Sequence, residues 1–424
     1  MKPLYHRQMN RTLYSLFGYL LLPILIIRLL FKSIKASEYH QRISERLGFI
    51  SKIPVPIIWI HCVSVGEFRA SITLIDTLIK QHPNHRILVT STTPTGSSAI
   101  KQHYGEQILH LYFPFDLGLI VNRYINRVQP EICILMETEI WPNLIHALKK
   151  SNIPSILING RMSERSLKKY QKFTPKLVSK TLNNLSLIAT QNQNSADRFI
   201  QLGASKNKVI NAGNIKFDQN PQADKLTTSA IKKIIGSRLV ITFASTHEGE
   251  EQKIINSFLT VKDKIDALLV VIPRHPERFN LVEKIASTAG LTIERRSSAR
   301  SATQADVLLG DSMGEMMSYF EVSDIVFMGG SLNDTGGHNM LEPAALSKPV
   351  LFGPTVFNFA EISSDLLSQQ AAIQVQNSNE LFEKIMELMN DEKQLKALGS
   401  NAKQYFNSQQ GAVKKISKLI AKLI

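Results

Sequence analysis

Glu67 is a carboxylate at a position where acid–base chemistry could take place. It follows the apolar run from Ile57 to Val63, which is typical of a buried strand, and precedes residues 68–80, whose apolar side chains recur at helical spacing. In a parallel α/β sheet, ligands bind at the edge where strands give way to helices. A carboxylate there can take a proton from a hydroxyl group and so act as a general base.

The residues around Glu67 also have a structural interpretation. Ser64-Val-Gly-Glu67 has the spacing of a capping box, in which the first and fourth side chains satisfy free N–H groups at the start of a helix. Gly66 lies in the short turn that this motif would form. Both interpretations, capping and catalysis, stay open on these residues alone.

Two more carboxylates, Glu137 and Glu139, follow the apolar run from Glu131 to Met136. Residues two apart in a strand share a face, so the two charges would repel each other and raise a pKa. Pro142 is typical of the first turn of a helix, where acidic residues are also favoured. We therefore expect both carboxylates at the edge of the sheet.

Basic and hydroxyl side chains follow other strand-like runs of the first half. Arg161 and Arg165, beside Ser163, would suit a phosphate or a carboxylate, and the solvated start of a helix fits them equally well. The hydroxyl-rich residues 90–98 could bind an anion, although capping and turn formation suit them better.

In the second half, basic residues and glycine turns follow the strand-like runs. Pro273-Arg-His-Pro-Glu-Arg278 offers charged donors to a phosphate. The turns at residues 310–316, 329–331 and 336–342 contain glycine, so their backbone N–H groups can face an anion. Two glycines would open a helix with Glu342 about a turn and a half in, where it could accept both hydroxyls of a ribose. Together these turns predict a nucleotide site.

Alternating strands and helices must position these residues. Strand-like runs cover residues 57–63, 86–92, 107–113, 131–136, 155–158, 185–190 and 208–211, then 239–244, 267–272, 291–294, 307–309, 325–328, 349–352 and 373–375. Helix-like segments lie between them, as at residues 68–80, 117–128, 142–150 and 195–202. The alternation predicts two parallel sheets covered by helices. Polar residues up to about Thr228 predict a linker, and the segment from Glu380 to Ile424 is predicted to be helical.

The composition is typical of a folded globular protein with an anionic partner. A chain of 424 residues is too long for one ordinary core, so two domains are expected. The net charge of +15 suits nucleic acid, an acidic membrane surface or a phosphorylated substrate, and charge alone does not choose among them. Cys62 and Cys133 are predicted to be buried, reduced thiols, and the sequence has no spacing typical of a metal site, so no metal is expected.

An apolar segment near the start of the chain predicts a membrane anchor. Residues 12–27 carry no charge, and the basic residues that flank them are Lys2, Arg7, Arg11, Arg28, Lys32 and Lys35. The strongly apolar run at residues 20–27 is shorter than the roughly 20 residues that span a bilayer comfortably. We expect an uncleaved anchor, either a short signal-anchor helix or a helix in the interface among anionic lipids. A buried helix covering the first domain is the alternative.

Seven motifs, taken together, resemble one family, the Kdo transferases of lipopolysaccharide synthesis. They are His61-Cys-Val-Ser-Val-Gly-Glu67, Met136-Glu-Thr-Glu-Ile-Trp-Pro-Asn143, Asn159-Gly-Arg-Met-Ser163, Gly213-Asn-Ile-Lys-Phe-Asp218, Pro273-Arg-His-Pro-Glu-Arg278, Gly310-Asp-Ser-Met-Gly-Glu315 and Gly337-His-Asn-Met-Leu-Glu-Pro343. They stand in the family's order along the chain. Members of that family move 3-deoxy-D-manno-octulosonic acid (Kdo) from CMP-Kdo to a lipid A precursor, lipid IVA.

The resemblance implies a fold and a location. The family has the GT-B fold, an α/β architecture in which two Rossmann-like, doubly wound domains face a cleft. Residues 1–35 would be the membrane anchor and its basic flank, residues 36–218 the acceptor-binding domain, and residues 219–405 the CMP-Kdo-binding domain. Residues 406–424 would form a helix that packs back on the first domain. The enzyme would work at the cytoplasmic face of the inner membrane, in contact with anionic lipids, without a cofactor or a metal.

The resemblance also implies roles for individual residues. Glu67 would be the general base of an inverting displacement, and the start of its helix would favour the ionised form. The acceptor-side or supporting residues would be Ser64, Gly66, Glu137, Glu139 and Arg161. The donor-binding residues would be Lys216, Arg274, His275, Arg278, Gly310, Ser312, Met313, Gly314, Glu315, Gly337, Asn339 and Glu342, with Glu342 holding the cytidine ribose.

Three other functions remain open on the sequence. Another enzyme of the same fold, such as a nucleotide-sugar epimerase or a different glycosyltransferase, is the nearest. A basic nucleic-acid-binding protein would fit the charge, but the sequence has no aromatic-rich platform or motif that reads nucleic acid, so no such partner is expected. A binding module with this fold and no turnover is the third.

Overall fold

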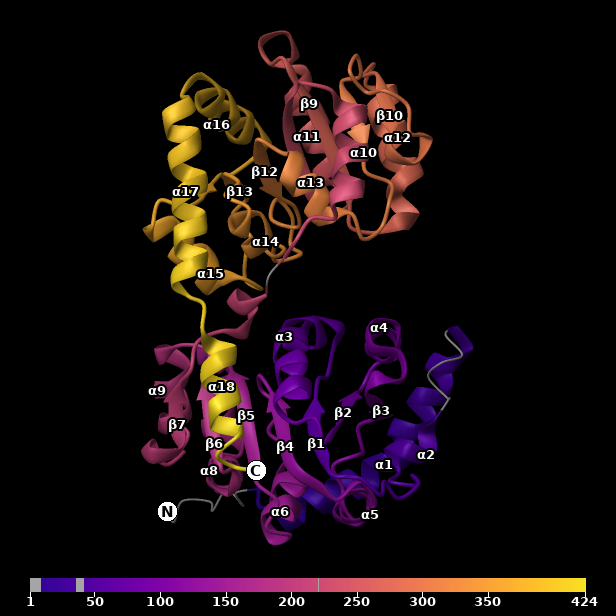
Figure 1. The fold of residues 1–424 in the computed structure, drawn as a ribbon, viewed down its shortest axis with the longest axis vertical. Helices are drawn as coiled ribbons and strands as arrows, with labels where there is room; N and C mark the ends of the chain where they lie inside the picture. Colours follow the sequence, from indigo (N-terminus) through magenta and orange to yellow (C-terminus); the bar gives the residue numbers. More distant parts are fainter. Residues whose placement is uncertain (1–8, 36–41, 220) are drawn as a thin grey trace, which may run out of the picture. The chain divides into compact units, whose positions relative to one another are not determined.

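The computed structural model describes residues 9–35, 42–219 and 221–424. The chain forms two compact units (Figure 1). The first unit takes the chain up to Gln219 together with Gln410–Ile424, and the second takes the chain between these two stretches. Each unit is built on a parallel sheet of its own.

The sheet of the first unit has seven parallel strands. They are β1 (Ile57–His61), β2 (Arg86–Ser91), β3 (Leu109–Tyr112), β4 (Pro130–Met136), β5 (Ser155–Gly160), β6 (Leu187–Thr190) and β7 (Val209–Asn211). Their order is β3-β2-β1-β4-β5-β6-β7. The chain thus runs outward from β1 to β3 and then returns to β4 on the other side of β1. The carboxyl ends of β1 and β4 flank this reversal, which is the point where ligands bind in such sheets.

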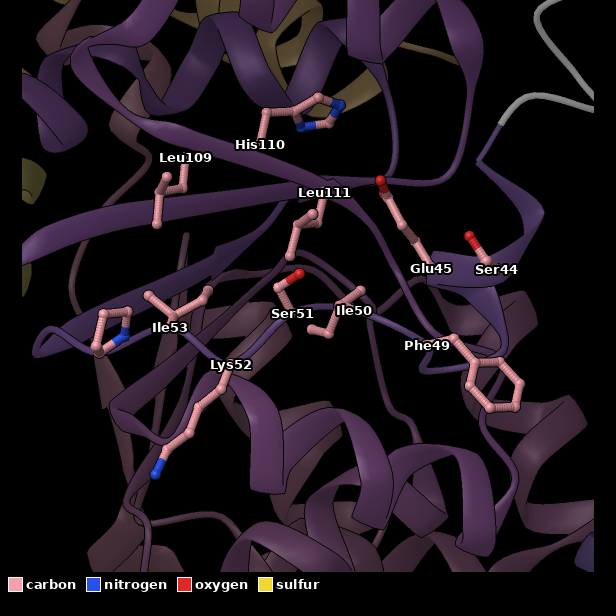
Figure 2. A pocket seen from close by; sticks show the side chains of 11 residues that line it. Ser44, Glu45, Phe49, Ile50, Ser51, Lys52, Ile53, Leu109, His110 and Leu111 are labelled. Carbon is pink, nitrogen blue, oxygen red and sulfur yellow. The ribbon is translucent and has the colours of Figure 1, made fainter.

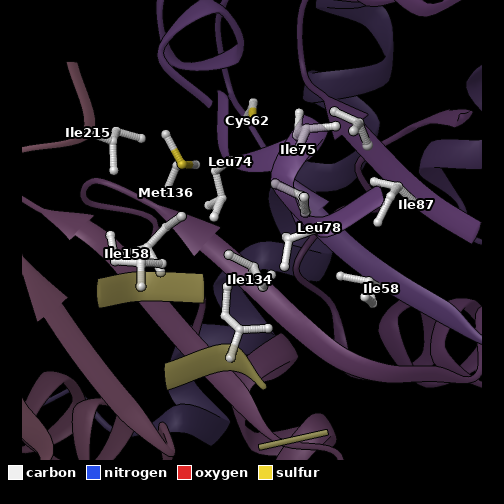
Figure 3. Packing of buried hydrophobic residues seen from close by; sticks show 14 of the residues in the cluster. Ile58, Cys62, Leu74, Ile75, Leu78, Ile87, Ile134, Met136, Ile158 and Ile215 are labelled. Atoms are coloured by element: carbon white, nitrogen blue, oxygen red, sulfur yellow. The ribbon is translucent and has the colours of Figure 1, made fainter. Parts of the chain in front are cut away.

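Helices cover both faces of this sheet. They are α2 (Ile43–Arg46), α3 (Val65–Gln81), α4 (Pro94–Tyr104), α5 (Gly118–Val128), α6 (Pro142–Lys150), α7 (Glu164–Phe173), α8 (Pro175–Asn184), α9 (Gln193–Gln201) and α18 (Ala412–Ile420), with the 3₁₀ turns η2 (Gly105–Gln107), η3 (Lys206–Lys208) and η4 (Ile215–Asp218). Ile58 and Ile60 enter the core that contains Leu74 of α3 (Figure 3), whereas Trp59 packs with Tyr124 in the core of the opposite face. Because both faces are covered, β1 is buried along its whole length.

The last helix belongs to the first unit. α18 contributes Val413, Ile416 and Ile420 to the core on the α3 side of the sheet. Its start is held by Asp218 of η4, whose carboxylate accepts hydrogen bonds from the N–H groups of Gly411 (2.6 Å) and Val413 (2.7 Å). The segment that follows the last strand of the first sheet therefore also fixes the returning helix.

The second unit repeats the architecture. Its strands are β8 (Leu239–Thr246), β9 (Ala267–Pro273), β10 (Ile293–Arg295), β11 (Val307–Leu309), β12 (Ile325–Met328), β13 (Val350–Phe352) and β14 (Ile373–Gln374), in the parallel order β10-β11-β9-β8-β12-β13-β14. Its helices are α10 (Lys225–Ile235), α11 (Glu250–Leu259), α12 (Phe279–Thr288), α13 (Met316–Val322), α14 (Leu341–Ala345), α15 (Ala360–Ser368), α16 (Ser378–Asn390) and α17 (Glu392–Ser408), with η5 (Lys262–Lys264), η6 (Pro276–Arg278) and η7 (Arg296–Ser298). The strand order reverses between β8 and β12, so a second switch point lies at their carboxyl ends.

Helix α1 (Arg11–Lys35) precedes the first sheet and has 25 residues. Among the described residues it is the one helix long and apolar enough to cross a membrane, by length and composition, and its most apolar window is not buried. The structure corrects the expected length, because the helix continues through the basic flank and so exceeds the roughly 20 residues needed. The exposure also disagrees with the alternative of a helix buried over the first domain.

All of the predicted strand-like runs form strands, with ends shifted by two residues at most. One prediction at the start of the second unit is wrong. Residues 225–228 belong to α10 and not to a linker, because the Asp224 carboxylate caps this helix by accepting from the N–H of Thr227 (2.7 Å). The segment from Glu380 to Ile424 is helical, as predicted, and consists of parts of three helices, with interruptions at Asp391 and at Gly411, which has a positive φ of 107°.

Candidate active site

Glu67 lies in the first turn of α3, directly after the end of β1. The Ser64 side chain caps the helix, since its Oγ accepts a hydrogen bond from the N–H of Glu67 (3.3 Å). The Glu67 Oε2 atom accepts from the N–H of Val63 (2.9 Å). The capping interpretation is therefore confirmed, although the carboxylate reaches Val63 and not Ser64. No hydrogen bond to Glu67 Oε1 occurs within the described residues, so capping does not occupy the whole carboxylate.

The pKa of the Glu67 carboxyl is raised to about 8, mainly by burial and also by the negative charges of Glu137 and Glu139. The Val63 N–H and the Lys216 ammonium act in the opposite direction. The start of the helix favours the ionised form, as expected, but desolvation of the carboxyl outweighs this effect. A carboxyl whose pKa lies near the working pH is suited to general base catalysis.

Glu137 and Glu139 lie in the turn after β4, and β4 pairs with β1, whose end leads to Glu67. Glu137 has a positive φ of 51°, so it has left strand geometry, and the expectation that the pair shares a strand face is wrong. Glu137 Oε1 lies 3.4 Å from Lys216 Nζ, and Glu139 Oε2 accepts from Trp141 Nε1 (2.7 Å). The negative charges of both carboxylates raise the pKa of Glu67.

His61, the last residue of β1, is a neighbour of this cluster that the predicted site residues did not include. Its ring stacks on Phe113 with centroids 3.6 Å apart, and its Nδ1 lies 3.0 Å from Thr90 Oγ1. Its Nε2 lies 3.7 Å from Glu139 Oε2. Burial lowers the pKa of His61 despite this carboxylate, so the imidazole is neutral. The signal in the sequence is a polar residue at the end of a wholly apolar strand.

Two predicted basic residues also lie in the first unit. Lys216, predicted to bind the donor, is on η4 and pairs with Glu137. Arg161 is exposed, and its backbone N–H donates to the carbonyl oxygen of Glu137 (3.3 Å). The structure therefore brings both residues to the turn that carries Glu137.

In the second unit, histidines gather at the carboxyl ends of β8 and β9. His247 follows β8, and its ring stacks on that of His338 with the two Nε2 atoms 2.7 Å apart. The ring of His275 lies edge-on to His247, with centroids 5.3 Å apart. The pKa of His338 is lowered to about 4, mainly by burial and also by His247. A neutral His338 can share one proton with His247, so this cluster offers hydrogen bonds more than charge.

The two predicted arginines after β9 differ in their surroundings. Arg274 is exposed, and its side chain makes no hydrogen bond or ion pair within the described residues. Arg278 instead donates to both oxygens of Glu251, at 3.3 and 3.0 Å. Glu251 is fully buried and also accepts from Thr246 Oγ1 (3.1 Å). The geometry leaves Arg274 available to an anionic ligand and holds Arg278 in an internal pair.

The predicted turn at residues 310–316 lies between β11 and α13. Ser312 Oγ donates to Glu315, and Glu315 Oε1 accepts from Arg296 (3.0 Å). Gly314 has a positive φ of 84°, which glycine adopts without strain, and Met313 is exposed. A Cβ at Gly310 would meet Ile272 at 2.8 Å, so this position needs glycine for packing. The turn is therefore organised by its own side chains.

The predicted turn at residues 336–342 precedes the short helix α14. The structure corrects the place of Glu342, which lies in the first turn because α14 begins at Leu341. Asn339 Nδ2 donates to Glu342 Oε1 (3.1 Å). Gly337 has a positive φ of 78°, and its N–H donates to the carbonyl oxygen of Gly330 (2.7 Å), which ties this turn to the one after β12.

Glu250 was not among the predicted site residues, yet its side chain holds the turn after β12 in place. It is fully buried, and its carboxylate accepts from the N–H groups of Gly330 (2.7 Å), Ser331 (3.0 Å) and Leu332 (2.9 Å). It also accepts from the N–H of His247 (2.9 Å). One buried carboxylate thus joins the ends of β8 and β12 at the switch point. Sequence alone gave no signal, because acidic residues are common in a first helical turn.

Neither a metal-binding cluster nor the cavity beside β3 forms part of these sites within the described residues. Within the described ranges, no group of three or more His, Cys, Asp or Glu side chains could hold a metal ion. The cysteines, Cys62 and Cys133, are free and buried, as predicted. A cavity of about 500 Å³ lies beside the edge strand β3, lined by residues such as Phe49, Leu109 and Leu111 (Figure 2). It does not include the carboxyl ends of β1 and β4.

Comparison with known proteins identifies the family. Residues 41–219 match the family described as 3-deoxy-D-manno-octulosonic-acid transferase (kdotransferase), and residues 254–405 match glycosyl transferases group 1. Over 406 residues the chain is 38% identical to the 3-deoxy-D-manno-octulosonic acid transferase of Haemophilus influenzae, covering 94% of this chain and 95% of that protein. This chain belongs to the Kdo transferase family. The resemblance seen in the seven motifs is confirmed, and the protein is a glycosyltransferase.

Solved structures show the fold of this Kdo transferase but do not separate enzymes that share it. A glycosyltransferase from Rickettsia africae is similar with a TM-score of 0.60 at 13% identity, covering 88% of this chain and 99% of that one. A UDP-GlcNAc 2-epimerase from Neisseria meningitidis, bound to UDP-GlcNAc, also has a TM-score of 0.60, at 14% identity, covering 87% and 100%. The predicted GT-B architecture of two Rossmann-like sheets is confirmed, and the sequence matches decide between transferase and epimerase.

Proposed function

We propose that this Kdo transferase moves Kdo from CMP-Kdo to the lipid A precursor lipid IVA, with inversion at the anomeric carbon, in the synthesis of the lipopolysaccharide inner core. The observation that carries the proposal is the position of Glu67. It lies at the switch point of the sheet that matches the Kdo transferase family, and Oε1 stays outside the helix cap. Its pKa of about 8 supports a role in proton transfer.

In the proposed mechanism, Glu67 takes the proton from a sugar hydroxyl of the acceptor. The oxygen of that hydroxyl attacks the anomeric carbon of Kdo from the face opposite CMP. The bond from this carbon to the phosphate oxygen breaks, and CMP leaves with the electron pair. Lys216 lies beside Glu137 and would contact the Kdo carboxylate or the phosphate. Ser64, Gly66, Glu137, Glu139 and Arg161 would shape the acceptor side.

CMP-Kdo would bind the second unit, at the carboxyl ends of β8, β9, β11 and β12. Arg274 is the exposed cation there and would balance the negative charge that develops on the phosphate. The remaining donor residues would be His275, Arg278, Gly310, Ser312, Met313, Gly314, Glu315, Gly337, Asn339 and Glu342. We assign acceptor binding to residues 36–218, donor binding to residues 219–405 and the returning helix to residues 406–424.

The location of the enzyme is part of the proposal. Helix α1 would anchor it in the inner membrane, with the two units on the cytoplasmic face and anionic lipids around the basic flank. The length and apolar composition of α1 support its role as an anchor. An acceptor that resides in the membrane would then lie close to the catalytic carboxylate.

The test is a transfer assay with full-length protein, lipid IVA and freshly generated CMP-Kdo, with products identified by mass spectrometry. We expect Glu67→Gln to lose about 10²–10⁴-fold in rate. Its amide oxygen can still accept from the N–H of Val63, so the helix cap survives. The matched control is Asn192→Ala, which removes the side-chain cap of α9, a change of about 1 kcal/mol, and is not among the proposed site residues.

The outcomes separate the functions that share this fold. Kdo-bearing products from wild type, strongly reduced in a folded Glu67→Gln, would support both the reaction and the base. Full activity in Glu67→Gln would restrict Glu67 to capping. If the folded wild type made no product with CMP-Kdo, a nucleotide-sugar epimerase would be the next function to test, with UDP-GlcNAc as the substrate.

A further inference from the structure

The start of α1 is fastened to the first unit. Arg11 and Ser15 both donate hydrogen bonds to Asn143 Oδ1, at 3.2 and 3.0 Å. Gly18 allows a close approach, because a Cβ at this position would lie 2.6 Å from a methyl carbon of Leu117. The helix is therefore docked on the first unit and is more than a tether to the membrane.

Next to these contacts, a cavity of about 530 Å³ separates α1 from the body of the first unit. One wall is formed by Phe17, Leu21 and Leu25 of α1. The other is formed mainly by residues 113–117, which follow β3, and by Trp141. Most of these side chains are apolar. We call this space the α1 cavity; its size is that of a site for a small ligand.

The α1 cavity has a polar end that leads to Glu67. Thr92 lines the cavity, and its Oγ1 donates to the carbonyl oxygen of Val63 (3.0 Å). Val63 is also the residue whose N–H holds the Glu67 carboxylate (2.9 Å). Trp141 lines the cavity too and donates to Glu139. The cavity therefore extends from the apolar helix to residues that touch the catalytic turn.

A second cavity, of about 340 Å³, continues this path. It shares Met9, Tyr14 and Trp141 with the α1 cavity and is also lined by Glu139. The side chains of Tyr14 and Trp141 thus lie between two spaces that both lead toward the Glu67 cluster. An anchor that served only to hold the protein at a membrane would need neither space.

We propose that the α1 cavity binds an acyl chain of the acceptor lipid while the sugar of that lipid is at Glu67. This inference rests on the proposed function, because it takes the acceptor to be a lipid. To reach Glu67 the sugar must rise out of the bilayer, which draws part of its chains toward water. Each methylene group exposed in this way would weaken binding by about fourfold. A cavity walled by α1 keeps such a chain covered on its way to the site.

The first experiment compares two substitutions on α1 in the full-length enzyme. Leu21→Trp fills the cavity, whereas Leu20→Trp changes a neighbouring residue that is 65% exposed and does not line it. We expect Leu21→Trp to raise the KM for lipid IVA about tenfold, with the KM for CMP-Kdo unchanged. Leu20→Trp should change neither. With the same acceptor sugar freed of its acyl chains, both variants should match wild type.

Two results of this comparison would overturn the proposal. One is an equal rise in KM from both variants, which would mean that α1 matters only as a membrane helix. The other is an equal rise with the deacylated acceptor, which would mean that Leu21→Trp disturbs the catalytic turn itself.

A second experiment detects the occupant directly. A lipid IVA analogue with a photoreactive group in an acyl chain is mixed with the enzyme in vesicles of anionic phospholipid, and the cross-linked peptides are mapped. We expect cross-links to Phe17, Leu21 or Phe113; cross-links confined to Leu20 and Ile24, which do not line the cavity, would overturn the proposal. Cross-linking needs no turnover, so it tests the cavity even if the transfer reaction itself is not observed. Failure of wild type to transfer to either acceptor would instead contradict the proposed function.

Discussion

Lys216 Nζ lies 3.4 Å from Glu137 Oε1, and this pair joins two motifs that are far apart in the sequence. Both members act on Glu67: the Glu137 carboxylate raises the pKa of its carboxyl, and the Lys216 ammonium lowers it. The proton affinity of the proposed base is therefore set by charges on two turns that the fold brings together. Changing either charge should change the pH dependence of the reaction.

The first prediction concerns the acid limb of the pH profile, the pH range in which kcat/KM rises with pH. Glu67 must lose its proton to act as a base, and its pKa is about 8, so kcat/KM should rise with pH up to about 8. Lys216→Met removes a positive charge and should move this limb to higher pH. Glu137→Gln removes a negative charge and should move it to lower pH. The control is Lys206→Met, an exposed lysine on η3. A limb that stays in place in all three variants would contradict the assignment.

The two arginines after β9 should give opposite results. Arg274→Ala removes an exposed cation and should raise the KM for CMP-Kdo at least tenfold while the melting temperature stays the same. Arg278→Ala leaves the buried Glu251 carboxylate unpaired and should lower the free energy of unfolding by about 3 kcal/mol. Thermal unfolding and steady-state kinetics measure both. If Arg278→Ala kept its stability and lost only donor affinity, the internal pair would not be its main role.

Glu250 is expected to be a stability determinant of the second unit. Replacing it with alanine leaves the N–H groups of Gly330, Ser331 and Leu332 without their acceptor in a buried turn. The free energy of unfolding should fall by about 2–4 kcal/mol, as measured by denaturant titration. Glu248→Ala, at an exposed position nearby, is the control and should have little effect. An equal loss in both variants would argue against the role of the buried carboxylate.

Asp218 should control the attachment of α18. Asp218→Ala removes the acceptor for two N–H groups at the start of this helix and should cost about 1–2 kcal/mol. Hydrogen exchange should then show faster opening of residues 412–420. Asp224→Ala removes a similar cap from α10 and should leave the exchange of α18 unchanged. Unaltered protection of α18 in Asp218→Ala would show that apolar packing alone holds it.

The strands were predictable because their apolar runs are dense and bounded by polar turns. The strand from Ile57 to His61 illustrates this. Because both faces of the sheet are covered, its residues do not alternate between apolar and polar but form a nearly continuous apolar run. Helix starts were harder to predict. Asp224 caps α10 within a stretch whose polar composition is equally typical of a linker. The helix begins there because the Asp224 carboxylate accepts a hydrogen bond from the N–H of Thr227, and the composition of the stretch does not predict this contact.

At the site, residue types could be predicted but their environments could not. The sequence indicated Glu67 and its capping motif, yet it gave no sign that the pKa of this carboxyl is raised, because burial is a property of the fold. Arg274 and Arg278 look alike in the sequence, and only the structure shows Glu251 beside one of them. Long-range pairs of this kind depend on which turns meet at the sheet edge.

The place of α18 has a consequence for the order in which the protein folds during synthesis. Together with Ala412, the α18 residues Val413, Ile416 and Ile420 complete a core whose other buried members all come from the chain up to Ile215. The ribosome makes them only after the whole second unit. One face of the first sheet therefore stays incompletely covered until the second unit has been made and α18 has emerged. The final folding step of the first unit thus follows the synthesis of the second unit, even if the second unit has already folded.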